Sequence, residues 1–256
     1  MIGTKFNKFI VRYALCASLG ALPALAQNNA PVRDPKALAL LAQCALNMGT
    51  SAIGDFYATG TITRSDSKDS PGTIVSQIKG VKMRNDITFP DGLHSYATNG
   101  TSGWNLQQGK RAKAPYAAFA YYRPEYVPAL ACVIDPLRPR MNVQQVGLEN
   151  VGINTAYHLE FSVPPSGSDN SETMISDFHV FLDQQTLVVL KTRTLIFDPA
   201  ALENHSVWET YYSDYRLVSG ALVPFHIENY LSGQKVNDIV FSSVQLNTGI
   251  PDGNFD

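Results

Sequence analysis

The chain has 256 residues, of which 45% are hydrophobic and 16% are charged. This is enough apolar material for a sizeable folded core and too little charge for a disordered protein. The formal net charge of −2 becomes −5 without the first 26 residues, because 17 basic residues then face 22 acidic ones. A negative chain argues against nucleic acid as a partner, since nucleic-acid binding requires a basic surface.

The first 26 residues have the pattern of a secretory signal peptide. They contain a positive leader (MIGTKFNKFIVR), an apolar stretch (YALCASLGALPALA) and a small-x-small cleavage site at Ala24 to Ala26. The alternative is an uncleaved anchor, but the apolar run is shorter than the roughly 20 residues that a membrane span needs. Cys16 does not stand at the cleavage site as a lipidated cysteine would. We expect a soluble periplasmic protein that begins near Gln27 and forms one domain over 27–256.

Two cysteines, Cys44 and Cys132, remain after cleavage. An exported chain meets oxidising conditions, so the two can form a disulfide. The alternative is a pair of separately buried thiols.

One helix opens the domain. Pro35 follows Asp34, Gly49 closes the segment, and Leu38, Leu41, Ala45 and Met48 recur at helical spacing. This pattern predicts an amphipathic helix that packs one face against something large.

From Asp55 onward the apolar period changes to two, which is typical of half-buried strands. The strand-like runs are 55–65, 73–89, 94–99, 102–106, 142–151, 156–163, 175–197, 205–220, 221–233 and 234–247. Ten or more strands in one chain predict a large antiparallel sheet that curls or closes, with an apolar inner face and a wet outer one.

The segment 114–136 interrupts the strands. It is rich in alanine and aromatic residues and is broken by four prolines, so we expect short helical pieces joined by kinks. These aromatic side chains either pack onto the sheet as core or form a hinged cover over an apolar cavity. The basic stretch GKRAK just before this segment is expected to be a solvated loop, with a contact to anionic lipid or an acidic partner as the alternative.

No GxSxG, HExxH, glycine-rich phosphate loop or CxxC motif occurs in the sequence. His158 with Glu160, and His226 with Glu228, stand two residues apart on predicted strands, where each pair shares a face. Two ligands do not make a metal site, so both pairs are more simply solvent-facing polar residues, and we expect no metal and no catalytic residue.

The order of elements resembles the LolA-like superfamily of bacterial periplasmic lipoprotein carriers. The resemblance is carried by LDQQT before a strand, YSDYRLVSGALVPFHIENY with Gly220 and Pro224, VQLNTGIPDGNF at the end, and GLENVGINTAYHLEF in mid-chain. It spans most of residues 36–256. The resemblance implies a mainly β fold (α+β): an incomplete β-barrel, covered by helices, whose apolar interior accepts the acyl chains of lipoproteins without a cofactor. In that family an arginine on an early strand ties the cover shut, and here Arg64 and Arg84 are both candidates.

We therefore expect a monomeric periplasmic carrier or binder of lipoproteins or other lipids, which shields acyl chains between an inner-membrane donor and an outer-membrane acceptor. The expected lining of the acyl cavity consists of inward-facing strand residues and two residues of the cover: Phe56, Ile62, Ile78, Met83, Ile87, Trp104, Leu159, Phe161, Val180, Phe225 and Ile227, with Phe119 and Tyr122 from the cover. A shift of one residue inverts the list for a strand, and each of these residues has ordinary core packing as its alternative.

Two other functions remain open. The same fold can serve a periplasmic sensor or protein-interaction module, which would co-purify with a membrane regulator. An enzyme acting on envelope lipids or glycans is the other alternative, and it would lose turnover when one of the histidine or carboxylate pairs is changed.

Overall fold

A computed structural model describes residues 30–66, 71–107, 109–114, 125–134, 140–164, 177–198 and 201–256. The predicted signal peptide and two expected cover residues, Phe119 and Tyr122, lie outside these ranges. The helices are α1 (Pro35–Asn47), η1 (Thr50–Ala52), η2 (Pro128–Leu130), α3 (Ala131–Ile134) and η4 (Asp252–Phe255). The strands are β1 (Phe56–Arg64), β2 (Gly72–Lys79), β3 (Lys82–Phe89), β4 (Gly92–Thr98), β5 (Gly103–Gln107), β6 (Lys110–Lys113), β7 (Asn142–Val151), β8 (Asn154–Ser162), β9 (Phe178–Asp183), β10 (Val189–Asp198), β11 (Ala201–Val218), β12 (Ala221–Leu231) and β13 (Gln234–Leu246).

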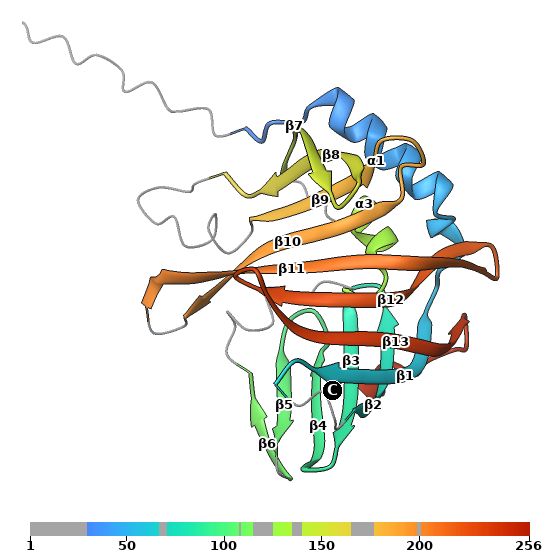
Figure 1. Cartoon of the computed structure of the whole chain (residues 1–256), viewed down its shortest axis with the longest axis vertical. Coiled ribbons are helices and arrows are strands. Elements are labelled where there is room, and N and C mark those ends of the chain that lie inside the picture. Colours follow the sequence, from blue (N-terminus) through green and yellow to red (C-terminus); the bar gives the residue numbers. More distant parts are fainter. Residues whose placement is uncertain are drawn as a thin grey trace, which may run out of the picture.

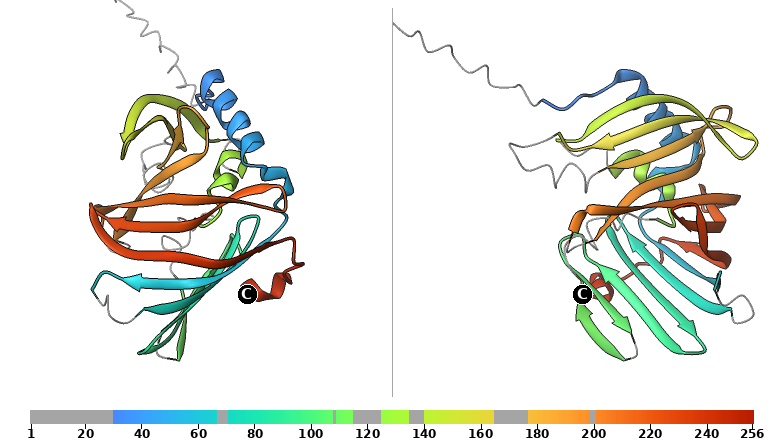
Figure 2. Two further views of the ribbon diagram at one scale, coloured as in Figure 1. Left: turned by 45° about the vertical axis from the view of Figure 1, so that its right-hand side comes forward. Right: turned by 60° about the vertical axis from the view of Figure 1, so that its left-hand side comes forward.

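The strands form one antiparallel sheet that does not close into a barrel. Its order is β6-β5-β4-β3-β2-β1-β13-β12-β11-β10-β9-β8-β7. The two halves of the chain are joined where β1 pairs with β13, and neighbours within each half are hairpin partners. Figures 1 and 2 show the sheet strongly curled, as expected for so many twisted strands. The predicted mainly β fold with an incomplete barrel and a few helices is confirmed.

One face of the curled sheet, here called the inner face, carries the hydrophobic core. On β2 the buried residues are alternate ones, Ile74, Ser76 and Ile78, and on β3 they are Met83, Asn85 and Ile87. Because side chains alternate between faces along a strand, the residues between them lie on the outer face. The period of two in the sequence therefore corresponds to a real difference in burial.

Helix α1 and the segment 125–134 pack against this inner face. Asp34 caps α1 by accepting a hydrogen bond from the Lys36 backbone N–H at 2.9 Å, and Pro35 occupies the first turn, as the sequence predicts. The helix buries Ala37, Leu41 and Cys44. Gly49 follows with φ of 65°, and a Cβ there would lie 2.1 Å from the Gly220 carbonyl oxygen, so this close approach requires glycine. None of the helices among the described residues is long and apolar enough to cross a membrane.

The C-terminal segment lies on the outer face of β2 and β3. Lys79 and Lys82 form ion pairs with Asp252, and Asn254 Nδ2 donates to Gln77 Oε1 at 2.8 Å. At the start of the segment, Asp55 accepts backbone N–H bonds from residues 248 to 250 at 2.7 to 3.1 Å. Burial opposes ionisation of Asp55, but these backbone donors outweigh it and lower the pKa of its carboxyl group.

Two local predictions differ from the structure. The run 73–89 is a hairpin, because Gly80 takes a φ of 59° and turns the chain between β2 and β3. The stretch GKRAK is not a solvated loop: Lys110–Lys113 forms β6, an edge strand whose four side chains are all exposed. A strand with no buried face has no alternation of apolar residues, so the hydrophobic pattern could not reveal it.

Candidate functional site

A single buried cluster lines the inner face over β1 to β3 and β7 to β13. It contains ten of the eleven lining residues predicted on strands, each at most 9% exposed: Phe56, Ile62, Ile78, Met83, Ile87, Leu159, Phe161, Val180, Phe225 and Ile227. They come from β1, β2, β3, β8, β9 and β12, which are distant in sequence. The structure thus brings these residues onto one continuous apolar surface.

Aromatic rings connect the sheet to the segment above it. Phe56 on β1 meets Phe241 on β13 edge to face, with ring centroids 5.9 Å apart. Tyr126, from the segment before η2, meets the same Phe241 ring at 5.8 Å. Further along the sheet, Phe161 and Phe178 lie 5.9 Å apart. Such contacts give the inner face large apolar surfaces with defined positions.

Trp104 was placed on the wrong face by the sequence prediction. Its cross-strand neighbours are Ala97 and, one strand further, Arg84, which belongs to the outer face. Arg84 and Arg111 stack on the indole at 5.6 and 4.2 Å from the ring centroid. On β5 the inner face is therefore occupied by Gly103 and Asn105, so Trp104 cannot line an inner cavity.

We call residues 125–134 the cover, because they close the inner face together with α1. Two residues of the cover make polar contacts with the sheet. Glu125 accepts hydrogen bonds from Trp208 Nε1 at 2.9 Å and from Thr210 Oγ1 at 3.0 Å, both on β11. The Tyr126 hydroxyl lies 3.2 Å from the Tyr96 hydroxyl on β4. Burial raises the pKa of Glu125, and the two hydrogen bonds only partly offset this.

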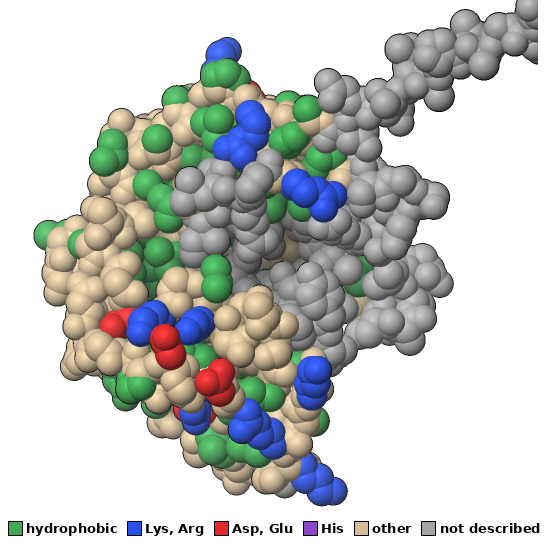
Figure 3. Space-filling view, turned by 180° about the vertical axis from the view of Figure 1, so that it is seen from behind, with side chains coloured by type: hydrophobic (Ala, Val, Ile, Leu, Met, Phe, Trp, Pro, Cys, Tyr) green, Lys and Arg blue, Asp and Glu red, His purple; other side chains and the backbone are tan. Residues whose placement is uncertain are grey.

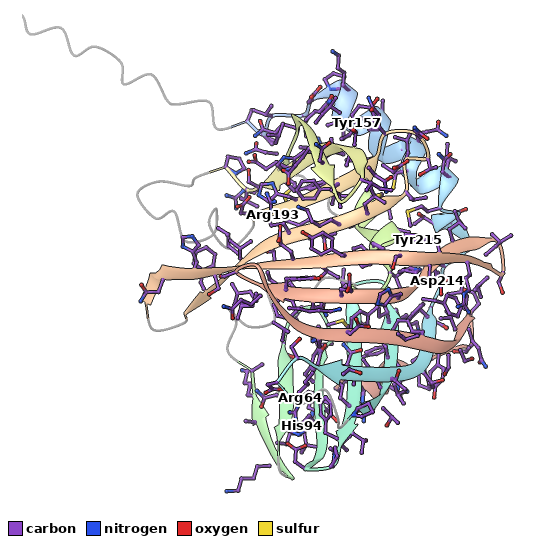
Figure 4. The ribbon with its side chains drawn as sticks, viewed as in Figure 1. Arg64, His94, Tyr157, Arg193, Asp214 and Tyr215 are labelled. Atoms are coloured by element: carbon purple, nitrogen blue, oxygen red, sulfur yellow. The ribbon has the colours of Figure 1, made fainter. Side chains whose placement is uncertain are left out.

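The two candidate arginines lie on opposite faces. Arg84 is on the outer face, where it bonds Asp86 and donates to the Asn254 carbonyl at 3.2 Å. Arg64 follows the inner-face residue Ile62 by two positions and stacks on the inner-face ring of Phe89 at 4.1 Å. In Figure 4 it lies beside His94, and both side chains face Asp91, at 3.8 and 3.2 Å. Of the two, only Arg64 shares a face with the cover.

Cys44 and Cys132 belong to the same buried cluster, on α1 and α3, which pack against each other. The structure holds them as two thiols and does not contain the expected disulfide. Cys44 Sγ lies 3.7 Å from Met48 Sδ within α1. Nearby, Tyr215 (Figure 4) donates its hydroxyl hydrogen to the Val189 carbonyl at 2.5 Å, and burial raises its pKa.

Comparisons with protein-family models and with curated proteins found no match. Several solved structures match over nearly their full length, and three of them have TM-scores above 0.5. A DUF1329 family protein from Desulfovibrio piger superposes with a TM-score of 0.55 at 16% identity and covers 88% of this chain and 98% of its own. A domain named for outer membrane lipoprotein sorting, from Vibrio parahaemolyticus, gives 0.53 at 12% identity, with 86% and 96% covered. A LolA superfamily protein from Nitrosomonas europaea gives 0.51 at 14% identity, with 86% and 97% covered.

This chain has a LolA-like fold. The resemblance seen in the sequence is thereby confirmed at the level of the fold. Identities of 12 to 16% carry no further conclusion about what the protein binds.

Polar clusters stand on the outer face of the LolA-like sheet. His158 Nε2 lies 2.9 Å from His179 Nδ1, and His179 Nε2 lies 3.2 Å from Asp177. Burial lowers the pKa of His158 to about 4, and the neighbouring His179 adds to this. The His158 ring stacks on Phe181 at 4.4 Å. His158 is therefore a neutral, packed side chain at physiological pH, and its polar neighbours are His179 and, at 3.6 Å, Glu149.

Beside Phe181, four charged residues form a compact network. Lys191, only 3% exposed, and Arg193 (labelled in Figure 4) both contact Glu149 and Glu209 at 2.9 to 3.2 Å. Desolvation opposes the charges of Glu149 and Glu209, but the two cations outweigh it and lower the pKa of both carboxyl groups. Every charge in the network has an opposite partner, which is typical of a structural role.

A second outer cluster contains the other predicted pair. Among the described residues, His226, Glu228 and Asp238 are the one group with metal-ligand spacing. His226 Nε2 lies 3.0 Å from Asp238 Oδ1. The Lys235 ammonium group contacts both Glu228 and Asp238, so a cation of the protein already bridges the two carboxylates. The interpretation of His226 and Glu228 as polar residues on the solvent face explains this cluster without a metal ion.

The outer face also carries a pocket between β5, β6 and the C-terminal segment. It has a volume of about 400 Å³ and is lined by Asn99, Ser102, Gly103, Trp104, Arg111, Ala112, Lys113, Phe255 and Asp256. Figure 3 shows Lys, Arg, Asp and Glu side chains gathered over the lower half of this face. The lining mixes both signs of charge, and it is separated from the inner cluster by the thickness of the sheet.

Proposed function

We propose that the protein is a periplasmic carrier or binder of lipoproteins or other lipids, which holds acyl chains between the inner face of the sheet and its cover. The observation that carries the proposal is the continuous apolar inner face, built from β1 to β3 and β7 to β13 and packed against α1 and the cover. The LolA-like fold supports it. In this proposal, residues 27–256 form one domain that acts as a monomer without a cofactor, between an inner-membrane donor and an outer-membrane acceptor.

The energetics of hydrocarbon burial suit such a role. Each buried CH₂ group contributes about 0.8 kcal/mol, so one long acyl chain gains on the order of 10 kcal/mol from a dry apolar site. The polar contacts of the cover with Trp208, Thr210 and Tyr96 contribute about 1 kcal/mol each. The cover also buries apolar side chains such as Val127 and Leu130, and an incoming acyl chain would replace those contacts on the inner face.

A protein-interaction module is the second candidate. The observation that favours it is the edge strand β6, whose four side chains are exposed at one end of the sheet. An exposed edge can pair with a strand of another protein. Capture of a membrane regulator by the exported protein, with no lipid bound, would favour this function over a carrier.

The first experiment is to express the chain with its leader, purify it from the periplasm and extract it for mass spectrometry of bound lipids and lipopeptides. The purified protein is then exposed to a fatty acid that carries a photoactivatable group, and the labelled peptides are mapped. We expect stoichiometric acylated cargo and labels on peptides of the inner cluster, including those with Phe161, Val180 and Ile227. Labels confined to the outer pocket, or an empty protein that takes no label, would contradict the proposal.

A matched pair of variants tests the same point. Phe161→Glu places a charge in the inner cluster, and Ile153→Glu places the same charge on a fully exposed turn residue. Burying an unpaired carboxylate against an acyl chain costs several kcal/mol, so we expect the first variant to lose its cargo and the second to keep it. Circular dichroism on both variants verifies that loss of cargo does not reflect loss of fold.

A further inference from the structure

Two polar residues stand in the middle of the apolar inner face. Ser76 on β2 and Asn85 on β3 are direct cross-strand partners, and both are 0% exposed. Along their strands they are flanked by buried apolar side chains, which are Ile74, Ile78, Met83 and Ile87. The register continues to Ala58 on one side and Tyr96 on the other, so the pair lies across the floor of the inner face.

Neither side chain has a hydrogen-bond partner. Ser76 Oγ and both amide atoms of Asn85, Nδ2 and Oδ1, are buried without a hydrogen-bond partner. Buried polar groups in proteins are nearly always hydrogen-bonded, and each one left unpaired costs about 1 to 3 kcal/mol. An apolar side chain of similar volume at position 85 would remove this cost. Packing alone therefore gives no reason for an asparagine here.

Other polar residues on the same face are paired. Thr210 Oγ1 donates to Asn229 Oδ1 at 2.8 Å, and Asn229 Nδ2 donates to Asn237 Oδ1 at 3.0 Å. Asn229 is as deeply buried as Asn85, at 1% exposed. Among the described residues of this face, Arg64 Nε also lacks a hydrogen bond, but the Arg64 guanidinium stacks on Phe89 and lies 3.8 Å from Asp91. Ser76 and Asn85 differ from it because no polar atom of either side chain has a partner.

The pair lies beside the cover. Tyr96, the cross-strand partner of Asn85, is the residue whose hydroxyl meets that of Tyr126. Tyr126 in turn packs on Phe241 in the central cluster. A ligand that displaces the cover from Tyr96 would therefore reach Asn85 and Ser76 next.

We propose that Ser76 and Asn85 recognise the carbonyl linkage of an acylated ligand, with an amide-linked acyl chain preferred over an ester-linked one and both over an ether. The inference rests on the proposed function. Asn85 offers one donor group and one acceptor, and Ser76 offers a hydroxyl. An acyl amide presents a C=O and an N–H and matches both functions of Asn85, an ester presents only acceptors, and an ether lacks the carbonyl.

The test compares three ligands with the same chain: N-methyl palmitamide, methyl palmitate and methyl hexadecyl ether. Each competes against a fluorescent acyl probe on the purified protein. Two variants of equal chemistry are measured beside the wild type, Asn85→Leu and Asn229→Leu. Comparing the amide-to-ether affinity ratio between the three proteins cancels the different hydration of the two ligands.

We expect the amide-to-ether ratio to fall about tenfold in Asn85→Leu, a factor that corresponds to about 1.4 kcal/mol. In Asn229→Leu the ratio should stay unchanged. We also expect Asn85→Leu to raise the melting temperature, because it removes two unpaired polar atoms, and Asn229→Leu to lower it, because it breaks two hydrogen bonds. Ser76→Ala is a smaller change and serves as the test if Asn85→Leu does not fold. We expect it to lower the amide-to-ether ratio as well.

The outcomes separate the two proposals. If all three ligands bind and the amide-to-ether ratio is the same in wild type, Asn85→Leu and Ser76→Ala, then the acyl site stands and recognition by the polar pair is wrong. If the wild type binds none of the three ligands, the proposed function itself fails and the inference fails with it.

Discussion

The Glu125 carboxyl group, which joins the cover to β11, provides a sharp test of how the cover is held. Burial raises its pKa despite the hydrogen bonds from Trp208 and Thr210. A carboxyl group whose pKa is higher in the folded state stabilises the fold below its unfolded pKa of about 4.3, and that stability is lost as the pH rises through the folded value. Glu125→Gln keeps an acceptor oxygen for both donors and cannot ionise.

The direction of the pH effect follows from the raised pKa. At pH 4, Glu125→Gln should be about as stable as the wild type, and at pH 8 it should be the more stable of the two, because the wild-type carboxyl group is then driven to ionise in a buried site. Glu125→Ala removes the Glu125 acceptor of Trp208 Nε1 and one of the two acceptors that share the single Thr210 hydroxyl hydrogen. Trp208 Nε1 still has Thr210 Oγ1 at 3.1 Å, and Thr210 still has Asn229 at 2.8 Å, so no donor is left without an acceptor. The cost of Glu125→Ala should be about 1 kcal/mol at pH 4 and smaller at pH 8.

Urea unfolding of the three proteins at pH 4, 6 and 8, followed by far-ultraviolet circular dichroism, measures these differences. The reasoning is refuted if Glu125→Gln is less stable than the wild type at pH 8, or if the difference between them does not change with pH. Exchange of a fluorescent acyl probe should be faster in Glu125→Ala than in Glu125→Gln, since only the alanine variant releases the cover from β11.

Three further predictions concern the frame around the site. Asp55→Asn should lose about 3 kcal/mol at pH 7 in a urea titration, because a charged acceptor of backbone N–H groups is replaced, and the difference should shrink below pH 4 as the wild-type carboxyl is protonated. The wild type should lose stability by up to about 1.4 kcal/mol per unit as the pH falls from 6.5 to about 4, because the unfolded state binds a proton that folded His158 resists. A shallower slope is expected in His158→Gln but not in His205→Gln, an exposed control. Gly60→Ala should cost about 1 to 3 kcal/mol, since its Cβ would lie 2.3 Å from the Val240 carbonyl oxygen, and an unchanged melting temperature would contradict this.

The inner face was predictable because alternation of apolar residues over long strands fixes which side chains are buried. The alternation placed Leu159 and Phe161, on the nine-residue strand β8, on the buried face. The alternation failed for Trp104, because β5 has only five residues and the one aromatic side chain of SGWNL was taken to face inward. A short strand has too few positions to set its own register, so tertiary pairing decides it.

Other features of the site depend on strand pairing and could not be predicted from the sequence. Nothing local distinguishes Arg64 from Arg84, and the contact of His158 with His179 depends on the pairing of β8 with β9. The unpaired state of Asn85 was also out of reach, although a signal was present: it occupies an apolar position in the alternation of β3, between Met83 and Ile87. A polar residue at such a position is worth noting in any sequence with a predicted acyl site.

The energetics of the cover bear on how cargo would leave. The described polar contacts between the cover and the sheet sum to a few kcal/mol, whereas an acyl chain gains on the order of 10 kcal/mol on entering the site. Opening the cover is therefore not sufficient for release into water, because the chain would lose its apolar surroundings. Release requires an acceptor that is equally apolar, such as a bilayer. An amide or ester bonded to Asn85 and Ser76 would exchange those hydrogen bonds for water at the bilayer interface, so the polar pair can select cargo without preventing its delivery.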